Sequence, residues 1–132
     1  MQYVFVYGTL RKQQANAHYL HEATCIAEEA WTYGRLFDTN EGYPAMILSK
    51  GEKVYGEVYE VSDMVLEKLD ELEEYTDNPE KDLYNRITQP VYLGDKTITA
   101  YVYIAYSEHM LLEPIISGDW LDYLKLSNQN KI

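Results

Sequence analysis

The stretch Ser62–Tyr75, SDMVLEKLDELEEY, has the apolar spacing of a helix that packs against a core. At about 100° per residue, its apolar side chains fall on one face: Val65, Leu66, Leu69 and Leu72. Glu73 falls on the same face, between Leu69 and Leu66, whereas Glu67, Glu71 and Glu74 fall on the opposite one. A core-facing carboxylate is costly unless it is paired, hydrogen-bonded or protonated. The pattern predicts one amphipathic helix with a single misplaced acid.

Glu73 therefore has two interpretations. Burial would raise the pKa of its carboxyl group toward the range that general acid–base catalysis uses. Alternatively, the last helical turn frays and the side chain reaches water, or Glu73 pairs with an arginine; Arg86 could pair with Glu73 or with Asp70. The helical pattern alone favours this structural interpretation, because ion pairs are commoner in proteins than catalytic acids.

Composition narrows the classes of protein to which the chain can belong. Its 132 residues suit one domain, and 46% hydrophobic with 25% charged residues is typical of a soluble globular protein. The net charge of −11 argues against nucleic acid and anionic membranes as partners. No apolar run is long enough to span a membrane, and no charged leader precedes the first apolar run. We therefore expect a cytoplasmic protein without a signal peptide.

Short β-rich runs separated by turn residues dominate the rest of the chain. The expected strands are Gln2–Tyr7, Thr24–Phe37, Ala45–Leu48, Val54–Val61, Tyr84–Leu93 and Thr97–Tyr106. We expect breaks at Glu28–Ala30 and Gly56, an edge or bulge at Pro90, and a hairpin turn at Gly94-Asp95. A polar loop, Thr76–Asp82, is expected to follow the helix. The tally is five to seven strands and two to four helices.

Two further helices are expected, and together the elements indicate the fold class. They are Ala17–Glu22 with Asn16 as its cap, and Gly118–Leu126 with Ser117 as its cap. Residues 127–132 are expected to fray. Because there is no βαβ alternation, repeat or linker, residues 1–132 should form a single α+β domain. Its expected architecture is a small, mostly antiparallel barrel or curved sheet with helices against it.

The segment Tyr7-Gly8-Thr9-Leu10-Arg11 is expected to turn directly after the first strand. Such a turn exposes consecutive backbone N–H groups, which can hold a carboxylate or an oxyanion, and Arg11 adds positive charge. The simpler interpretation is a plain turn with a solvated cation, and the pattern alone favours it.

Metal binding and nucleophilic catalysis have little support in the residues. His18 and His21 are three residues apart, whereas zinc ligands on a helix usually come four apart, and His109 is the only other histidine. Cys25 lies in a β-rich stretch, where a lone cysteine is most often a small buried hydrophobe. We expect no metal site.

Six short motifs occur in order along nearly the whole chain: Val6-Tyr7-Gly8-Thr9-Leu10, Gly42-Tyr43-Pro44-Ala45, Gly56-Glu57-Val58-Tyr59, Leu69-Asp70-Glu71-Leu72-Glu73, Tyr84-x-Arg86 and Ser117-Gly118-Asp119-Trp120. Each is weak alone, but the ordered set resembles the gamma-glutamyl cyclotransferase-like family, in particular its small members similar to gamma-glutamylamine cyclotransferase. The resemblance implies a small mixed barrel with flanking helices and an enzyme that uses no metal and no cofactor.

The resemblance also implies roles for particular residues. The family's tyrosine-glycine-x-leucine loop binds the gamma-glutamyl group through backbone amides, and here it corresponds to Tyr7, Gly8, Thr9 and Leu10. The glutamate that closes the family's helix motif is the general acid–base, and here it corresponds to Glu73. No definite role follows for Arg11, Tyr84, Arg86 or the C-terminal segment.

The implied reaction acts on a small gamma-glutamyl amide or dipeptide. The substrate's own α-amine attacks its γ-carbonyl, which releases 5-oxoproline and an amine or amino acid, while Glu73 transfers the protons. One alternative is a non-catalytic module that binds a gamma-glutamyl or amino-acid-like ligand. Another is an interaction protein in which Glu73 is merely ion-paired. The sequence indicates neither the leaving group nor the oligomeric state.

Overall fold

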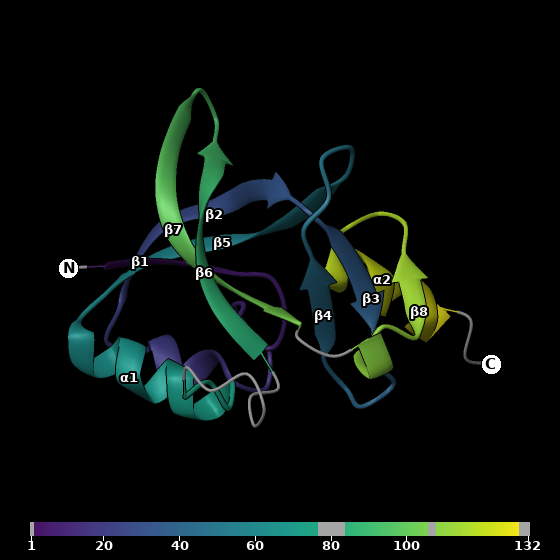
Figure 1. Ribbon diagram of the computed structural model, residues 1–132, viewed down its shortest axis with the longest axis horizontal. Helices are drawn as coiled ribbons and strands as arrows, with labels where there is room; N and C mark the ends of the chain where they lie inside the picture. Colours follow the sequence, from purple (N-terminus) through teal and green to yellow (C-terminus); the bar gives the residue numbers. More distant parts are fainter. Residues whose placement is uncertain (1, 77–83, 106–107, 130–132) are drawn as a thin grey trace.

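A computed structural model describes residues 2–76, 84–105 and 108–129, and it confirms the α+β class. Its larger unit is a closed barrel of five strands (Figure 1). In order around the barrel, these are β1 (Gln2–Val6), β5 (Lys53–Val61), β2 (Thr24–Tyr33), β6 (Tyr84–Leu93) and β7 (Lys96–Ala105). A second sheet has the order β4 (Pro44–Ile47), β3 (Arg35–Asp38) and β8 (Glu113–Ile115). The helices are α1 (Asp63–Leu72), α2 (Trp120–Gln129) and the short 3-10 helices η1 (Ala17–Leu20) and η2 (Glu108–Met110).

The barrel is mixed because its closing pair is parallel. β1 pairs with β7 at Val4 and Tyr101, while the other barrel pairs are antiparallel. The β6–β7 hairpin turns at Gly94, which has a φ of 62°. Its register runs without a shift through Pro90, and β6 lies between β2 and β7. The expectation of an edge or bulge at Pro90 was therefore wrong.

Two glycines, Gly56 and Gly34, explain where the observed strands differ from the expected ones. β5 runs straight through Gly56, where a side chain would come within 2.2 Å of the Val6 carbonyl oxygen. The glycine thus admits the close approach of β1 rather than interrupting the strand. The stretch after Thr24 breaks at Gly34, where the chain passes from β2 to β3 and the second sheet. Glu28–Ala30 carries only a shift in register against β5.

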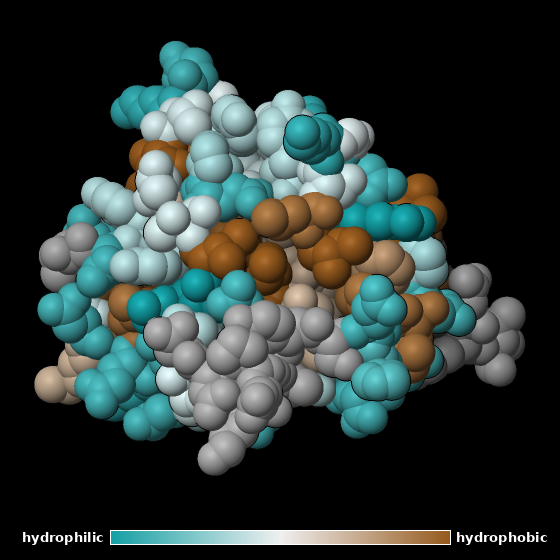
Figure 2. Space-filling model, in the orientation of Figure 1, coloured by the Kyte–Doolittle hydropathy of each residue, from teal (hydrophilic) through white to brown (hydrophobic). Residues whose placement is uncertain are grey.

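Helix α1 packs against the barrel as its apolar pattern predicts. The Ser62 hydroxyl accepts a hydrogen bond from the Val65 N–H (3.2 Å) and caps the first turn. Val65, Leu66 and Leu69 are buried in one core cluster with residues of β1, β5 and η1. The part of the helix that is in view in Figure 2 carries mostly polar side chains. The helix ends at Leu72 rather than at the expected Tyr75.

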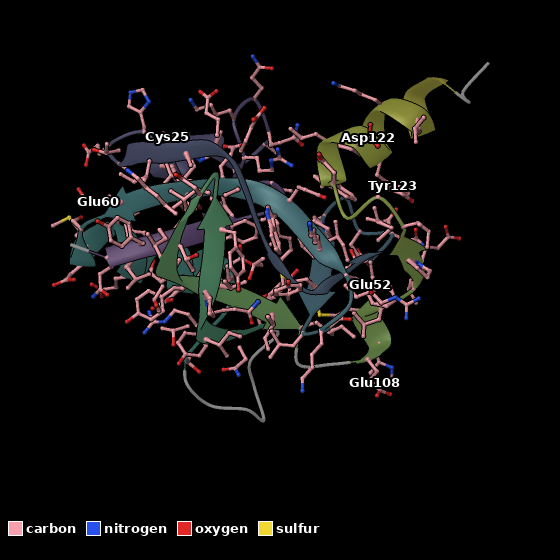
Figure 3. The ribbon with its side chains drawn as sticks, turned by 90° about the horizontal axis from the view of Figure 1, so that it is seen from above. Cys25, Glu52, Glu60, Glu108, Asp122 and Tyr123 are labelled. Atoms are coloured by element: carbon pink, nitrogen blue, oxygen red, sulfur yellow. The ribbon has the colours of Figure 1, made fainter. Side chains whose placement is uncertain are left out.

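Helix α2 lies beside the second sheet. The Tyr123 hydroxyl donates a hydrogen bond to Asp38 of β3 (2.6 Å), and Figure 3 shows this helix away from the Cys25 end of the barrel. Its cap is Asp119, whose carboxylate accepts from the Leu121 N–H (3.0 Å), and not the expected Ser117. Both residue types cap helices, and the left-handed Gly118 between them (φ 70°) sets where the first turn begins.

The remaining expectations concern the C-terminal part and the loop after α1. β8 is an eighth strand in the described residues, beyond the expected five to seven, and α2 continues to Gln129. The residues 130–132 of the expected frayed tail and most of the polar loop predicted for Thr76–Asp82 lie outside the described residues. No helix in the described part of the chain is long and apolar enough to cross a membrane.

Candidate active site

The end of β1 and the end of α1 form two walls of a cavity of about 230 Å³. The turn Val6–Leu10 provides one wall, and Glu73 and Glu74 provide another. Tyr84 of β6 and Tyr103 of β7 reach the same space from the barrel, and Pro44 of β4 closes it. Segments far apart in the sequence meet here because the barrel brings the end of its first strand beside the end of α1.

The turn after β1 leaves backbone donors available to a ligand. The Arg11 N–H donates to the Gly8 carbonyl (3.0 Å), and the Asn16 N–H donates to the Thr9 carbonyl (2.8 Å). Within the described part of the chain, the N–H groups of Thr9 and Leu10 donate to no protein acceptor. A side chain at Gly8 would come within 2.7 Å of the Pro44 ring, so only glycine fits this wall.

Glu73 ends helix α1 and lies in the cavity wall. Its backbone N–H still donates to the Leu69 carbonyl (2.9 Å). The next two N–H groups close a Schellman motif, from Glu74 to the Glu71 carbonyl (3.2 Å) and from Tyr75 to the Asp70 carbonyl (2.8 Å). No described side chain donates a hydrogen bond to the Glu73 carboxyl group. Burial raises the pKa of this group from 4.5 to about 7.

Arg86 pairs with Asp70 rather than with Glu73. Its guanidinium Nη1 lies 2.6 Å from an Asp70 carboxylate oxygen, and the other oxygen accepts from the Tyr103 hydroxyl (2.7 Å). The guanidinium also stacks over the rings of Tyr101 (4.5 Å) and Tyr75 (5.1 Å). These contacts hold both sides of the turn that carries Glu73, and no described residue pairs with the Glu73 carboxyl group.

The hydroxyl groups of three tyrosines in the cavity wall donate hydrogen bonds to protein acceptors. The Tyr7 hydroxyl donates to the Tyr103 carbonyl (2.6 Å), and the Tyr84 hydroxyl donates to the Pro44 carbonyl (3.0 Å). Burial, followed by the charge of Glu73, raises the pKa of Tyr7. Burial is also the main cause of the raised pKa of Tyr84 and Tyr103. These phenols therefore stay neutral, and the raised pKa of Glu73 lies near neutral pH.

A buried ion-pair network anchors the turn after β1. The Arg11 guanidinium lies 3.0 Å from the Glu57 carboxylate of β5 and 3.0 Å from the Asp119 carboxylate. Glu57 also accepts from the Lys12 N–H (3.0 Å) and from the Tyr59 hydroxyl (2.8 Å). Arg11 is thus not a solvated cation, and the sequence-based interpretation of a plain turn missed Glu57. One feature of the sequence could have indicated this ion pair. Glu57 is an acidic residue inside the predicted strand Val54–Val61, and Arg11 is a cation that could compensate its charge.

The other residues considered from the sequence lie outside the cavity wall. His18 and Cys25 are on η1 and β2, and neither they nor His21 line the cavity. Among the described residues, no three His, Cys, Asp or Glu side chains gather in a way that could hold a metal. The cavity wall contains instead a carboxyl group of near-neutral pKa and, in the turn after β1, backbone N–H groups that donate to no described acceptor.

Comparisons with known proteins agree with this picture. The family described as "Gamma-glutamyl cyclotransferase, AIG2-like" matches residues 4–122. A gamma-L-glutamyl-butirosin B gamma-glutamyl cyclotransferase of Niallia circulans is 40% identical over 121 residues, which cover 91% of this chain and 76% of that protein. The gamma-glutamylaminecyclotransferase A of Danio rerio is 41% identical over 86 residues, covering 56% and 52% of the two chains. The crystal structure of Bacillus subtilis YkqA superposes with a TM-score of 0.81 at 31% identity, covering 98% of this chain and 43% of that one.

Proposed function

Since the chain belongs to the gamma-glutamyl cyclotransferase, AIG2-like family of enzymes, we propose that it cleaves a gamma-glutamyl amide by intramolecular aminolysis with Glu73 as general acid–base. The observation that carries the assignment of Glu73 is its position: a carboxyl group without a partner among the described residues, with a pKa raised to about 7, in the wall of the same cavity as the turn Gly8–Leu10. A carboxyl group of that pKa both accepts and donates a proton near neutral pH.

In the proposed reaction Glu73 takes a proton from the substrate's α-ammonium group. The freed nitrogen lone pair attacks the γ-carbonyl carbon, which forms the new ring bond and places negative charge on the carbonyl oxygen. When that charge collapses, the bond from the γ-carbon to the amide nitrogen breaks, and Glu73 returns its proton to the leaving nitrogen. The restored carboxylate then takes the second proton of the ring nitrogen and passes it to the released amine, which leaves as an ammonium ion. The products are 5-oxoproline and a free amine, and neither water nor a covalent enzyme intermediate is required.

The turn after β1 supports substrate binding in this scheme. The available N–H groups of Thr9 and Leu10 suit an α-carboxylate or the developing oxyanion. The neutral phenols of Tyr7, Tyr84 and Tyr103 form a polar but uncharged wall. Because the attack is intramolecular, the site mainly folds the substrate into a reactive conformation and transfers protons.

The test is to incubate the protein with a panel of gamma-glutamyl amides and measure 5-oxoproline. Glu73→Gln should lower kcat by at least about 100-fold, since general acid–base catalysis contributes that much. The matched control is Glu71→Gln, which removes an exposed carboxylate from the same helix outside the cavity wall. In the wild type, kcat/KM should decrease as the pH is lowered through the Glu73 pKa of about 7, because the protonated carboxyl group cannot accept the ammonium proton.

Two outcomes would contradict the proposal. Unchanged turnover in Glu73→Gln with a confirmed substrate would show that Glu73 is not the acid–base. If no gamma-glutamyl amide yields 5-oxoproline but the amides bind, the protein is the non-catalytic binding module that the sequence left open.

A further inference from the structure

Glu74 has a backbone conformation that favours glycine. Its φ is 52°, in the left-handed region, at the position of the Schellman motif where helices usually carry glycine. The Glu74 side chain is nevertheless exposed and lines the cavity beside Glu73. The chain thus places a second carboxylate at the solvent side of the site, at a position where a glycine would be less strained.

The cavity wall contains no described lysine or arginine. The two nearby guanidinium groups are already engaged, Arg11 with Glu57 and Arg86 with Asp70. The described residues therefore give the site two carboxylates and no compensating cation. A negatively charged leaving group would meet repulsion here, and a positively charged one would meet attraction.

A third carboxylate lies near the same rim. Burial raises the pKa of the Tyr43 hydroxyl, which also lines the cavity. The negative charges of Glu41, Glu74 and Glu73 raise it further, in that order. Since Glu41 and Glu74 are exposed, their charge acts on whatever part of a ligand extends toward solvent.

The proposed reaction leaves Glu74 without a task in the gamma-glutamyl half of the substrate. Glu73 takes the α-ammonium proton, and the N–H groups of Thr9 and Leu10 suit the α-carboxylate. The part of the substrate that remains to meet the exposed rim is the leaving group.

We propose that Glu74 is a specificity-determining residue that selects gamma-glutamyl amides whose leaving amine carries a second, positively charged amino group. The same carboxylate disfavours gamma-glutamyl amino acids, whose leaving group bears a carboxylate. This inference rests on the proposed function, because it assigns the leaving-group end of the same cavity.

The test compares three gamma-glutamyl amides of matched length. Their leaving amines are 1,5-diaminopentane, which is cationic, hexylamine, which is neutral, and 6-aminohexanoate, which is anionic. The wild type should show the highest kcat/KM with the cationic amide and the lowest with the anionic one. Glu74→Gln should lower the cationic-to-neutral ratio of kcat/KM about fivefold, the size expected for a solvent-exposed pair of charges, and 0.5 M salt should lower it in the wild type.

The matched control is Glu67→Gln. It removes the same charge from the exposed face of α1 outside the cavity wall, so the ratio should stay at the wild-type value. Equal ratios in the wild type and Glu74→Gln would overturn the inference, as would an equal fall in the control.

Binding separates this inference from the proposed function. Dissociation constants of the three amides, measured by calorimetry with Glu73→Gln and with the Glu73→Gln/Glu74→Gln double variant, report the charge preference without turnover. If 5-oxoproline never forms but the preference is present and depends on Glu74, the proposed function fails and the specificity role stands. If neither turnover nor binding discriminates among the amides, the specificity role is wrong.

Discussion

Replacing Glu73 by glutamine should stabilise the protein, and the gain should grow with pH. Burial holds the pKa of Glu73 near 7 in the folded state, against 4.5 for an ordinary glutamate. A raised folded-state pKa means that the folded protein binds this proton more tightly than the unfolded chain. The protonated form is fully favourable below about pH 4.5, and its contribution is lost as the pH rises through about 7.

The size of the effect follows from the same shift. At about 1.4 kcal/mol per pKa unit, ionised Glu73 costs the folded state about 3 kcal/mol at alkaline pH, and about 2.5 kcal/mol of that appears between pH 5 and 8.5. Glutamine has nearly the same shape and no charge to desolvate. Any cost of its unpaired amide is independent of pH, so it cancels when the gain at pH 5 is subtracted from the gain at pH 8.5.

The assay is urea unfolding of the wild type and Glu73→Gln at both pH values. The difference between their midpoints should grow by about 1–2 M urea from pH 5 to 8.5. Glu71→Gln, on the exposed face of the same helix, should change the midpoint equally at both. A pH-independent difference, or a variant that loses stability as the pH rises, would contradict the desolvation that raises the pKa of Glu73. Combined with lost turnover, a stability gain would identify Glu73 as a strained functional group.

Three further predictions concern stability. Glu74→Gly should raise the midpoint of thermal unfolding, followed by circular dichroism, by about 4 °C, because glycine removes about 1 kcal/mol of left-handed strain at φ 52°; a lower midpoint would contradict the strain. Arg11→Met should cost about 3–5 kcal/mol in urea unfolding by leaving the buried Glu57 carboxylate uncompensated, and adding Glu57→Leu should restore part of it. Gly56→Ala should lower the calorimetric unfolding temperature by more than 5 °C, since its methyl group would lie 2.2 Å from the Val6 carbonyl oxygen; an unchanged value would mean that β1 and β5 can separate at no cost.

The helix that carries Glu73 shows how far sequence patterns reach. Its apolar face, its Ser62 cap and the exposure of Glu67 and Glu71 agree with the predicted pattern, because side-chain spacing and capping are local properties. The pattern also places Glu73 among the apolar side chains. It could not decide whether Arg86 would pair with Glu73 or with Asp70, since both acids lie within reach of a long side chain.

Other differences have the same origin in contacts between distant segments. Gly56 was expected to interrupt its strand, because the reason for a glycine there, the close approach of β1, exists only in the folded barrel. The choice between Ser117 and Asp119 as a cap depends on where α2 docks beside β3. The Arg11–Glu57 pair joins residues that are 46 positions apart, so no local pattern connects them.

The sequence by itself determined the α+β class, most of the elements, the apolar face of α1 and, through an ordered set of motifs, a family resemblance. These follow from the period of apolar residues, from turn chemistry and from local spacing, all of which are written along the chain. Only the tertiary structure decided that the end of β1 and the end of α1 share one cavity, that Arg86 is occupied by Asp70, and that a second carboxylate stands at the rim. The pKa of Glu73 and the charge of its cavity depend on which groups the closed barrel brings together and which it keeps from water.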